Sequence, residues 1–131
     1  MKPFKKIADA EWEIMNCIWE LGDVVTVREV HSRLYPKGEK AYTTVQTIMN
    51  ILVEKGYLEK KKIGMVNFYK PTKTREEVAH EETRSLVSKI FGGSFLSLAH
   101  FLINSPQLSE EDMKELKAFL DAKEKELKKS K

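Results

Sequence analysis

Short hydrogen-bonding side chains are concentrated in the segment from Ala41 to Gly56, AYTTVQTIMNILVEKG, in which no acidic residue precedes Glu54. Threonine, glutamine and asparagine can bond to base edges and phosphates without bringing charge of their own. At helical spacing these side chains share one face, and the apolar side chains share the other. The pattern is typical of a DNA recognition helix, although an ordinary solvated helix face also produces it.

Six side chains of this helix are candidate DNA ligands. They are Tyr42, Thr43, Thr44, Gln46, Thr47 and Asn50. The residues expected deepest in the groove are Thr44, Thr47 and Asn50, and those expected at the phosphate margin are Tyr42 and Thr43. Thr43 and Gln46 also fit a capping box, in which both side chains would bond to the start of their own helix instead.

A basic β-hairpin is predicted directly after this helix. Two strand-like runs, 57–62 and 67–71, are joined through a turn that contains Gly64. The leading run carries Lys60, Lys61 and Lys62, which we expect to contact the DNA backbone. A lysine run on its own is more often a solvated surface, but its place after a recognition-type helix favours a wing.

The preceding residues predict the elements that position this helix. A helix rich in apolar residues is expected to begin with Asp9 as its N-cap and to end at Gly22. Val24–Val25 resembles a short strand, and a capping box at 26–29 begins a second helix that ends near 35–38. The order is helix, short strand, helix, turn, helix, which is the order of a helix-turn-helix domain.

Charge is distributed unevenly along the 131 residues, whose net charge is +3. Residues 1–73 hold 13 Lys and Arg against 9 Asp and Glu, a net +4, whereas residues 74–131 hold 10 against 11, a net −1. The basic excess therefore falls in the half with the threonine-rich helix, and it favours contact with phosphates.

The second half predicts three short helices with apolar faces, beginning near Thr74, Ser94 and Ser109. Such helices bury little surface alone, so we expect a second copy of the chain to cover them. The candidate dimerisation residues are Leu86, Ile90, Phe91, Leu98, Phe101, Leu102, Met113, Leu116 and Leu120. Packing against the first half of the chain is the alternative.

Little in the sequence indicates catalysis. Cys17 is the single cysteine and lies in an apolar helical pattern, so we expect a core residue and neither disulfides nor a thiolate metal site. The run from His80 to Arg84, HEETR, lacks the second histidine of a zinc-protease helix. We expect no metal, no cofactor and no enzymatic activity, and, without a signal peptide or membrane span, a cytoplasmic protein.

Several motifs, taken together, resemble the BlaI/MecI/CopY penicillinase-repressor family. They are Glu11 to Met15 with Ile18 and Trp19, Thr26-Val27, Tyr42 to Thr47, Lys55 to Leu58, Lys62-x-Gly64, Tyr69-x-Pro71, Gly92 to Phe95, and Leu108 to Leu116. The resemblance runs from about Ile7 to Lys123. It implies a winged helix-turn-helix domain (1–73), a three-helix dimerisation domain (74–131) and a homodimeric repressor on double-stranded, inverted-repeat operator DNA, with the third helix in the major groove.

The resemblance also suggests how repression is relieved. In β-lactam-responsive members a membrane receptor-linked metalloprotease pathway cuts an Asn-Phe bond in the dimerisation domain, and the matching position here is His100-Phe101. The histidine departs from that pattern, the cysteine cluster of copper-responsive members is absent, and Met65 stands where an arginine often follows the wing glycine. A winged-helix module for protein–protein interaction, without specific DNA binding, is the alternative function.

Overall fold

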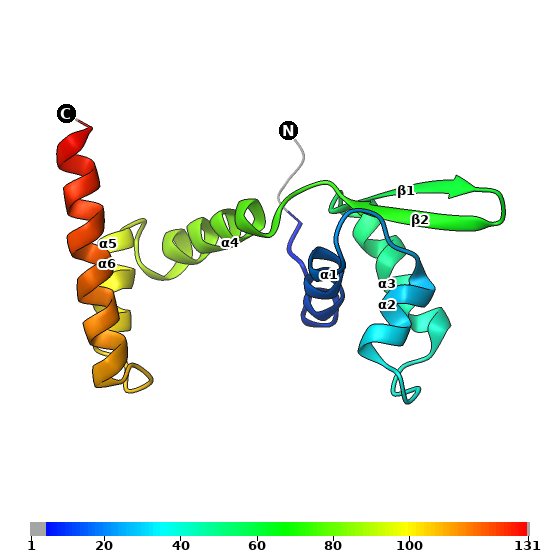
Figure 1. Cartoon of the computed structure of the whole chain (residues 1–131), viewed down its shortest axis with the longest axis horizontal. Helices are drawn as coiled ribbons and strands as arrows, with labels where there is room; N and C mark the ends of the chain where they lie inside the picture. Colours follow the sequence, from blue (N-terminus) through cyan, green and yellow to red (C-terminus); the bar gives the residue numbers. More distant parts are fainter. Residues whose placement is uncertain (1–4, 131) are drawn as a thin grey trace. The chain divides into compact units, whose positions relative to one another are not determined.

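Residues 5–130, which the computed structural model describes, form six helices and one two-stranded hairpin. In chain order the elements are α1 (Asp9–Leu21), α2 (Val27–Leu34), α3 (Tyr42–Glu54), β1 (Leu58–Ile63), β2 (Val66–Pro71), α4 (Arg75–Ile90), α5 (Phe95–Ile103) and α6 (Glu110–Lys129) (Figure 1). This mainly helical chain with a small hairpin confirms the predicted fold class.

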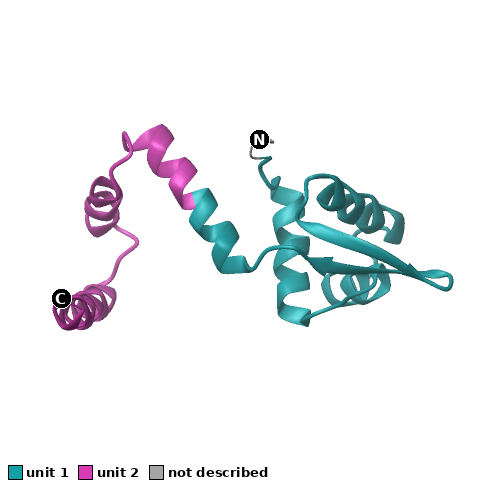
Figure 2. Cartoon of the chain, turned by 90° about the horizontal axis from the view of Figure 1, so that it is seen from above, with its two compact units in different colours: residues 1–82 teal, residues 83–131 magenta. Residues whose placement is uncertain are grey.

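Two compact units divide the chain, Met1–Glu82 and Thr83–Lys131, and the division falls inside α4 (Figure 2). The first half of α4 belongs to the first unit, because Val78 is buried in its core. The two expected domains, 1–73 and 74–131, stay a prediction about which segments fold independently.

The core of the first unit is built from the apolar faces of α1, α2 and α3 and from the base of the hairpin. Apolar residues recur every three or four positions in each helix and so fall on one face. The fully buried side chains here are Ile14, Met15, Ile18, Val25, Val30, Val45, Met49, Leu52, Tyr69 and Val78. Burial of one such side chain contributes about 1.5–3 kcal/mol, so these contacts hold α3 in place while its opposite face stays in solvent.

Most of the capping hydrogen bonds predicted at the helix starts are present in the structure. In α2 the Thr26 hydroxyl accepts the Glu29 backbone N–H at 3.2 Å, and the Glu29 carboxylate accepts the Thr26 N–H at 3.0 Å. This confirms the predicted capping box. The caps predicted at Thr74, Ser94 and Ser109 are confirmed as well.

The start of α1 differs from the prediction. Asp9 is the first helical residue and Ala8 is the N-cap, so the predicted Asp9 cap is wrong. The Glu11 carboxylate bonds back to the N-cap residue, because it accepts the Ala8 N–H at 3.1 Å. Glu11 also pairs with Lys55, just after α3, with 2.7 Å between Oε1 and Nζ. The pair therefore joins the start of α1 to the end of α3.

The start of α3 differs too. Ala41 is the N-cap, and its carbonyl accepts the first backbone hydrogen bonds of the helix. Thr43 and Gln46 consequently lie within the helix, and the capping box predicted for them is wrong. A side chain of α2 anchors the loop that precedes α3, because His31 Nε2 lies 2.7 Å from the Lys40 carbonyl oxygen. Neither Thr43 nor Gln46 is needed to cap the helix.

β1 and β2 pair in antiparallel register, with Lys60 opposite Tyr69 and Ile63 opposite Val66. Gly64 in the connecting turn has φ +64°, a left-handed conformation that residues with a side chain rarely adopt. The predicted hairpin is confirmed, and it is called the wing below. The expected strand at Val24–Val25 shrinks to a single bridge between Val25 and Tyr69.

The second unit buries few of its apolar side chains. Val87 is buried, and the rings of Phe91 and Phe101 lie 5.6 Å apart between centroids. The exposed large apolar residues of this unit are Leu86, Ile90, Phe95, Leu96, Phe101, Leu102, Ile103, Met113, Phe119, Leu120 and Leu127. Among the described helices, none is by itself long and apolar enough to span a membrane; α4 and α5 reach that length and hydropathy only together, across a bend of 88°.

Candidate nucleic-acid interface

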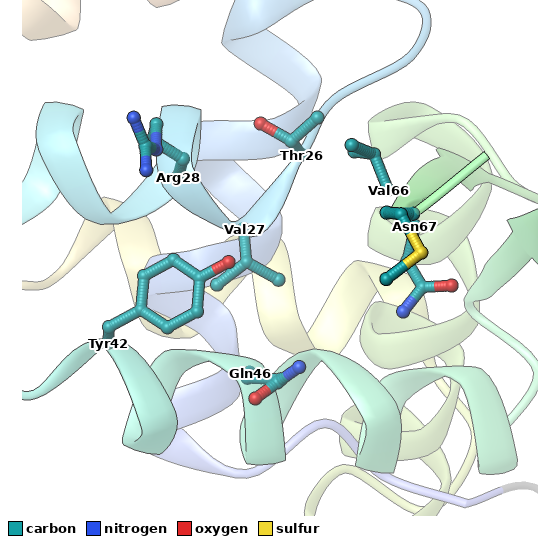
Figure 3. A pocket seen from close by; sticks show the side chains of 8 residues that line it. Thr26, Val27, Arg28, Tyr42, Gln46, Val66 and Asn67 are labelled. Carbon is teal, nitrogen blue, oxygen red and sulfur yellow. The ribbon is translucent and has the colours of Figure 1, made fainter. Parts of the chain in front are cut away.

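A cleft of about 350 Å³ lies between the start of α2, one side of α3 and the outer part of the wing. The residues that line it are Thr26, Val27, Arg28, Tyr42, Gln46, Met65, Val66 and Asn67. Figure 3 shows Tyr42 and Gln46 on α3, facing Arg28 on α2 and Asn67 on the wing. Three separate elements thus supply polar side chains to one concave surface.

The candidate DNA-contacting residues of α3 lie in different parts of its surface. Tyr42 and Gln46 line the cleft, whereas Thr43, Thr44 and Thr47 are exposed on the helix surface. The Thr47 hydroxyl donates to the Thr43 carbonyl at 2.9 Å, and its oxygen keeps lone pairs for an outside donor. This surface offers hydrogen bonds without a charged group of its own.

Asn50, one helical turn beyond Gln46, is half-buried and contacts the base of the wing. Its Oδ1 accepts the Tyr69 hydroxyl at 3.0 Å and the Lys60 ammonium at 3.2 Å. Burial, with a smaller effect from Tyr42, raises the pKa of the Tyr69 hydroxyl, so that group is protonated and donates at neutral pH. Only the structure reveals that the Asn50 oxygen is engaged within the protein.

The three lysines of β1 are all exposed, but they do not share one face of the hairpin. Because side chains alternate along a strand, Lys60 and Lys62 lie on the face of their cross-strand partners Tyr69 and Asn67. Lys61 lies on the opposite face. Lys60 and Tyr69 both contact Asn50, so the hairpin face that carries Lys62 is the one turned toward α3.

Sequence reasoning missed Arg28 and Asn67. Arg28 does carry a signal, because it occupies the first turn of α2, where the positive end of the helix dipole disfavours a cation. An arginine in that position is available to an anion from outside the chain. Arg28 is also the one charged side chain among the residues that line the cleft. Asn67 gives no such signal, since its place depends on the hairpin register.

The described side chains that could bind a metal ion or act in catalysis are dispersed over the structure. Within residues 5–130, no cluster of three or more His, Cys, Asp or Glu side chains is arranged to hold a metal ion. Cys17 is buried, which confirms the expected core role, and this burial raises the pKa of its thiol.

The candidate cleavage bond lies inside α5. His100 and Phe101 are both exposed, and they border a pocket of about 540 Å³ together with Asn104 to Gln107. The His100 carbonyl accepts the Asn104 backbone N–H at 3.3 Å and its side-chain amide at 2.9 Å. A protease that needs an extended substrate would have to open this last turn of the helix.

Known proteins resemble the chain in both sequence and fold. Residues 7–122 match the penicillinase repressor family. The penicillinase repressor of Bacillus licheniformis is 30% identical over 121 residues, which cover 92% of this chain and 94% of that protein. The methicillin resistance regulatory protein MecI of Staphylococcus aureus is 24% identical over 118 residues, covering 90% of this chain and 95% of the relative.

The solution structure of the DNA-binding domain of the repressor BlaI aligns with a TM-score of 0.50 and 32% identity, over 59% of this chain and 93% of that domain. The named relatives are repressors or regulatory proteins, and the family resemblance expected from the motifs is confirmed. The chain therefore belongs to the penicillinase repressor family, the BlaI and MecI group of winged-helix, DNA-binding repressors.

Proposed function

We propose that this repressor binds an inverted-repeat operator as a homodimer, with α3 in the major groove and the wing against the DNA backbone. The observation that carries the proposal is the exposed, uncharged polar face of α3 beside a cleft that holds Arg28. The threonines would reach base edges, and the cations of α2 and the wing would meet phosphates. Tyr42 and Gln46 would contact the DNA from the cleft itself.

Dimerisation is supported by the apolar surface of the second unit. Eleven large apolar side chains of this unit are exposed, and extensive apolar surface of this kind marks interaction sites. A two-fold dimer would cover this surface with the same surface of a second chain, and it would present two α3 helices to a symmetric site. The exposed members of the expected interface come from α4, α5 and α6, and they are Leu86, Ile90, Phe101, Leu102, Met113 and Leu120.

Relief of repression is proposed at the His100–Phe101 bond, cut by a receptor-linked metalloprotease pathway. Both residues are exposed, which supports access of a protease to the bond. The helical hydrogen bonds of the His100 carbonyl oppose cleavage, so local opening of α5 would come first.

Fluorescence anisotropy tests the operator proposal directly. The purified chain is titrated into the promoter upstream of its own gene and into a scrambled duplex, across a salt series. We expect the promoter to bind about a thousandfold more tightly, with two chains per site. Equal, weak binding to both duplexes and to DNA selected from a random pool would favour the protein-interaction module instead.

The two outer lysines of β1 provide a matched pair. Lys62→Ala should weaken all duplexes alike and lower the salt slope of log K by about 1, because one phosphate contact is lost. Lys61→Ala, which removes the same charge from the opposite face of the hairpin, should change the slope by less than half as much. Equal slopes for the two variants would show that the hairpin face does not decide which lysine meets DNA.

A further inference from the structure

Asn50 is held at the junction of α3 and the wing by one cross-strand pair. Tyr69 and Lys60 lie opposite each other in the hairpin register, so their side chains leave the same face. Both donate to the Asn50 Oδ1 atom, at 3.0 and 3.2 Å. Tyr69 is fixed in turn, since it is fully buried and its backbone pairs with Val25.

The lysine contact identifies which end of the Asn50 amide faces the wing. An ammonium group has three donors and no lone pair, so it bonds to the amide oxygen and not to the NH2 group. The Tyr69 hydroxyl gives its hydrogen to the same oxygen. The amide nitrogen of Asn50 is therefore the end that neither donor occupies, and its two hydrogens can serve an acceptor from outside the chain.

We propose that Asn50 both positions the wing on α3 and reads one base through donors alone, an inference that rests on the proposed operator binding. Asparagine commonly reads adenine with both ends of its amide, accepting from N6 and donating to N7. Here the Asn50 oxygen is occupied, and the two-point contact with adenine is therefore lost. The remaining NH2 group suits N7 or O6 of guanine, N7 of adenine and O4 of thymine, and it opposes the N4 amino donor of cytosine.

The test varies each base of one half-site of the operator duplex and measures binding of the full chain by anisotropy. At the position whose preference disappears in Asn50→Ala, we expect adenine and guanine to bind within about twofold and cytosine about tenfold more weakly. In Tyr69→Phe the amide loses its buried donor and keeps only the Lys60 ammonium, which is exposed and can move into solvent, so the amide can turn. The cytosine penalty should then shrink to less than about threefold, while affinity for scrambled DNA stays within about twofold.

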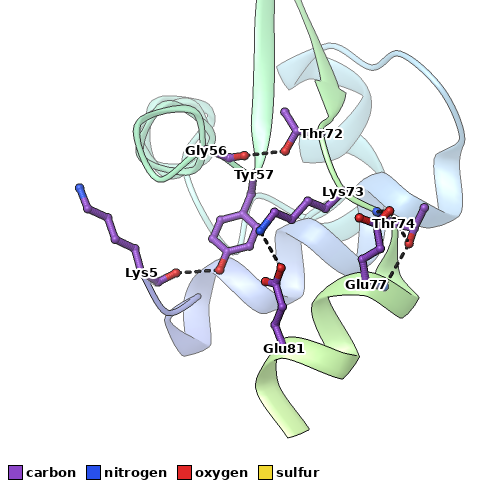
Figure 4. A network of polar contacts seen from close by, with 8 residues as sticks. All are labelled: Lys5, Gly56, Tyr57, Thr72, Lys73, Thr74, Glu77 and Glu81. Atoms are coloured by element: carbon purple, nitrogen blue, oxygen red, sulfur yellow. Dashed lines mark hydrogen bonds and ion pairs between the residues drawn. The ribbon is translucent and has the colours of Figure 1, made fainter. Parts of the chain in front are cut away.

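Tyr57 supplies the matched control. Its hydroxyl donates to the Lys5 carbonyl at 2.7 Å, on the side of the unit where Lys73 pairs with Glu81 at 2.8 Å (Figure 4). Burial, with nearby carboxylates, raises the pKa of Tyr57 to about 12, so it too is a protonated donor. Tyr57→Phe removes a comparable buried hydrogen bond, and it should alter stability but leave every base preference as in the wild type.

Asn50→Asp separates the positioning role from the reading role. The carboxylate keeps an acceptor for Tyr69 and Lys60 but has no donor, so the wing stays attached while cytosine becomes the favoured base at that position. Unchanged base preferences in both Tyr69→Phe and Asn50→Asp would overturn the assignment of Asn50. A wild-type chain that prefers no operator over scrambled DNA would instead overturn the proposed function, and this inference with it.

Discussion

Replacing Leu120 by glutamate will turn the proposed dimer into monomers and weaken binding to the proposed inverted repeat by about 10²- to 10⁴-fold. Met113, Leu120 and Leu127 are seven residues apart, so they lie along one face of α6, and they are 40%, 63% and 56% exposed. Such a repeat packs against another helix in coiled coils. A carboxylate at its centre would lose hydration among apolar side chains. Monomers would then bind each half-site separately, because the second contact is no longer intramolecular.

Sedimentation and anisotropy together measure this effect. Ala118→Glu places the same charge on the opposite side of α6, where residue 118 is exposed, and it should stay dimeric. Leu120→Glu should keep the wild-type affinity for a single half-site duplex and the wild-type helical circular dichroism. If Leu120→Glu remains dimeric, this face of α6 is not the interface. If it becomes monomeric and still binds the full repeat as tightly as the wild type, operator affinity does not depend on the dimer.

Replacing Glu11 by methionine will lower the free energy of unfolding of the winged-helix unit by about 3 kcal/mol. The Glu11 and Lys55 side chains are only 9% and 22% exposed, with 2.7 Å between Oε1 and Nζ. The Lys55 ammonium also donates to the Lys6 carbonyl at 2.9 Å. Without the carboxylate, that ammonium stays largely shielded from water with one neutral acceptor, and the Ala8 N–H loses its acceptor as well.

Tryptophan fluorescence during urea unfolding isolates this unit, because both tryptophans, Trp12 and Trp19, are on α1. Glu54→Met makes the same chemical change at an exposed position of α3 and should cost less than about 0.5 kcal/mol. The double variant Glu11→Met with Lys55→Met should recover most of the loss, since no charge is then left buried. A Glu11→Met protein as stable as Glu54→Met would mean that the pair contributes little.

Short-range patterns predicted most of the elements correctly. The box between Thr26 and Glu29 and the cap at Ser109 depend on groups three residues apart, so their formation follows from local sequence. Gly64 similarly marks the turn of the wing, because the turn needs a left-handed residue. The apolar spacing of α1 and α3 predicted which faces are buried, since a helix repeats every 3.6 residues.

The errors concern two helix starts whose surrounding residues also contact more distant parts of the chain. α3 begins at Tyr42, ahead of the predicted Thr43 box, and the loop before it is anchored by the contact of His31 with Lys40. The N-cap of α1 is Ala8 and not Asp9, and Glu11, which bonds back to Ala8, also reaches Lys55 across the unit. Sequence windows of a few residues contain neither contact.

The sequence by itself determined the family, the wing and the uncharged polar face of α3, because these depend on residue types and local spacing. Only the tertiary structure decided which polar atoms remain for DNA. The Asn50 oxygen is occupied by Tyr69 and Lys60, and the hairpin register separates Lys61 from its two neighbours. A hydrogen bond needs two groups within about 3 Å, and for residues far apart in the chain that distance is set by packing alone.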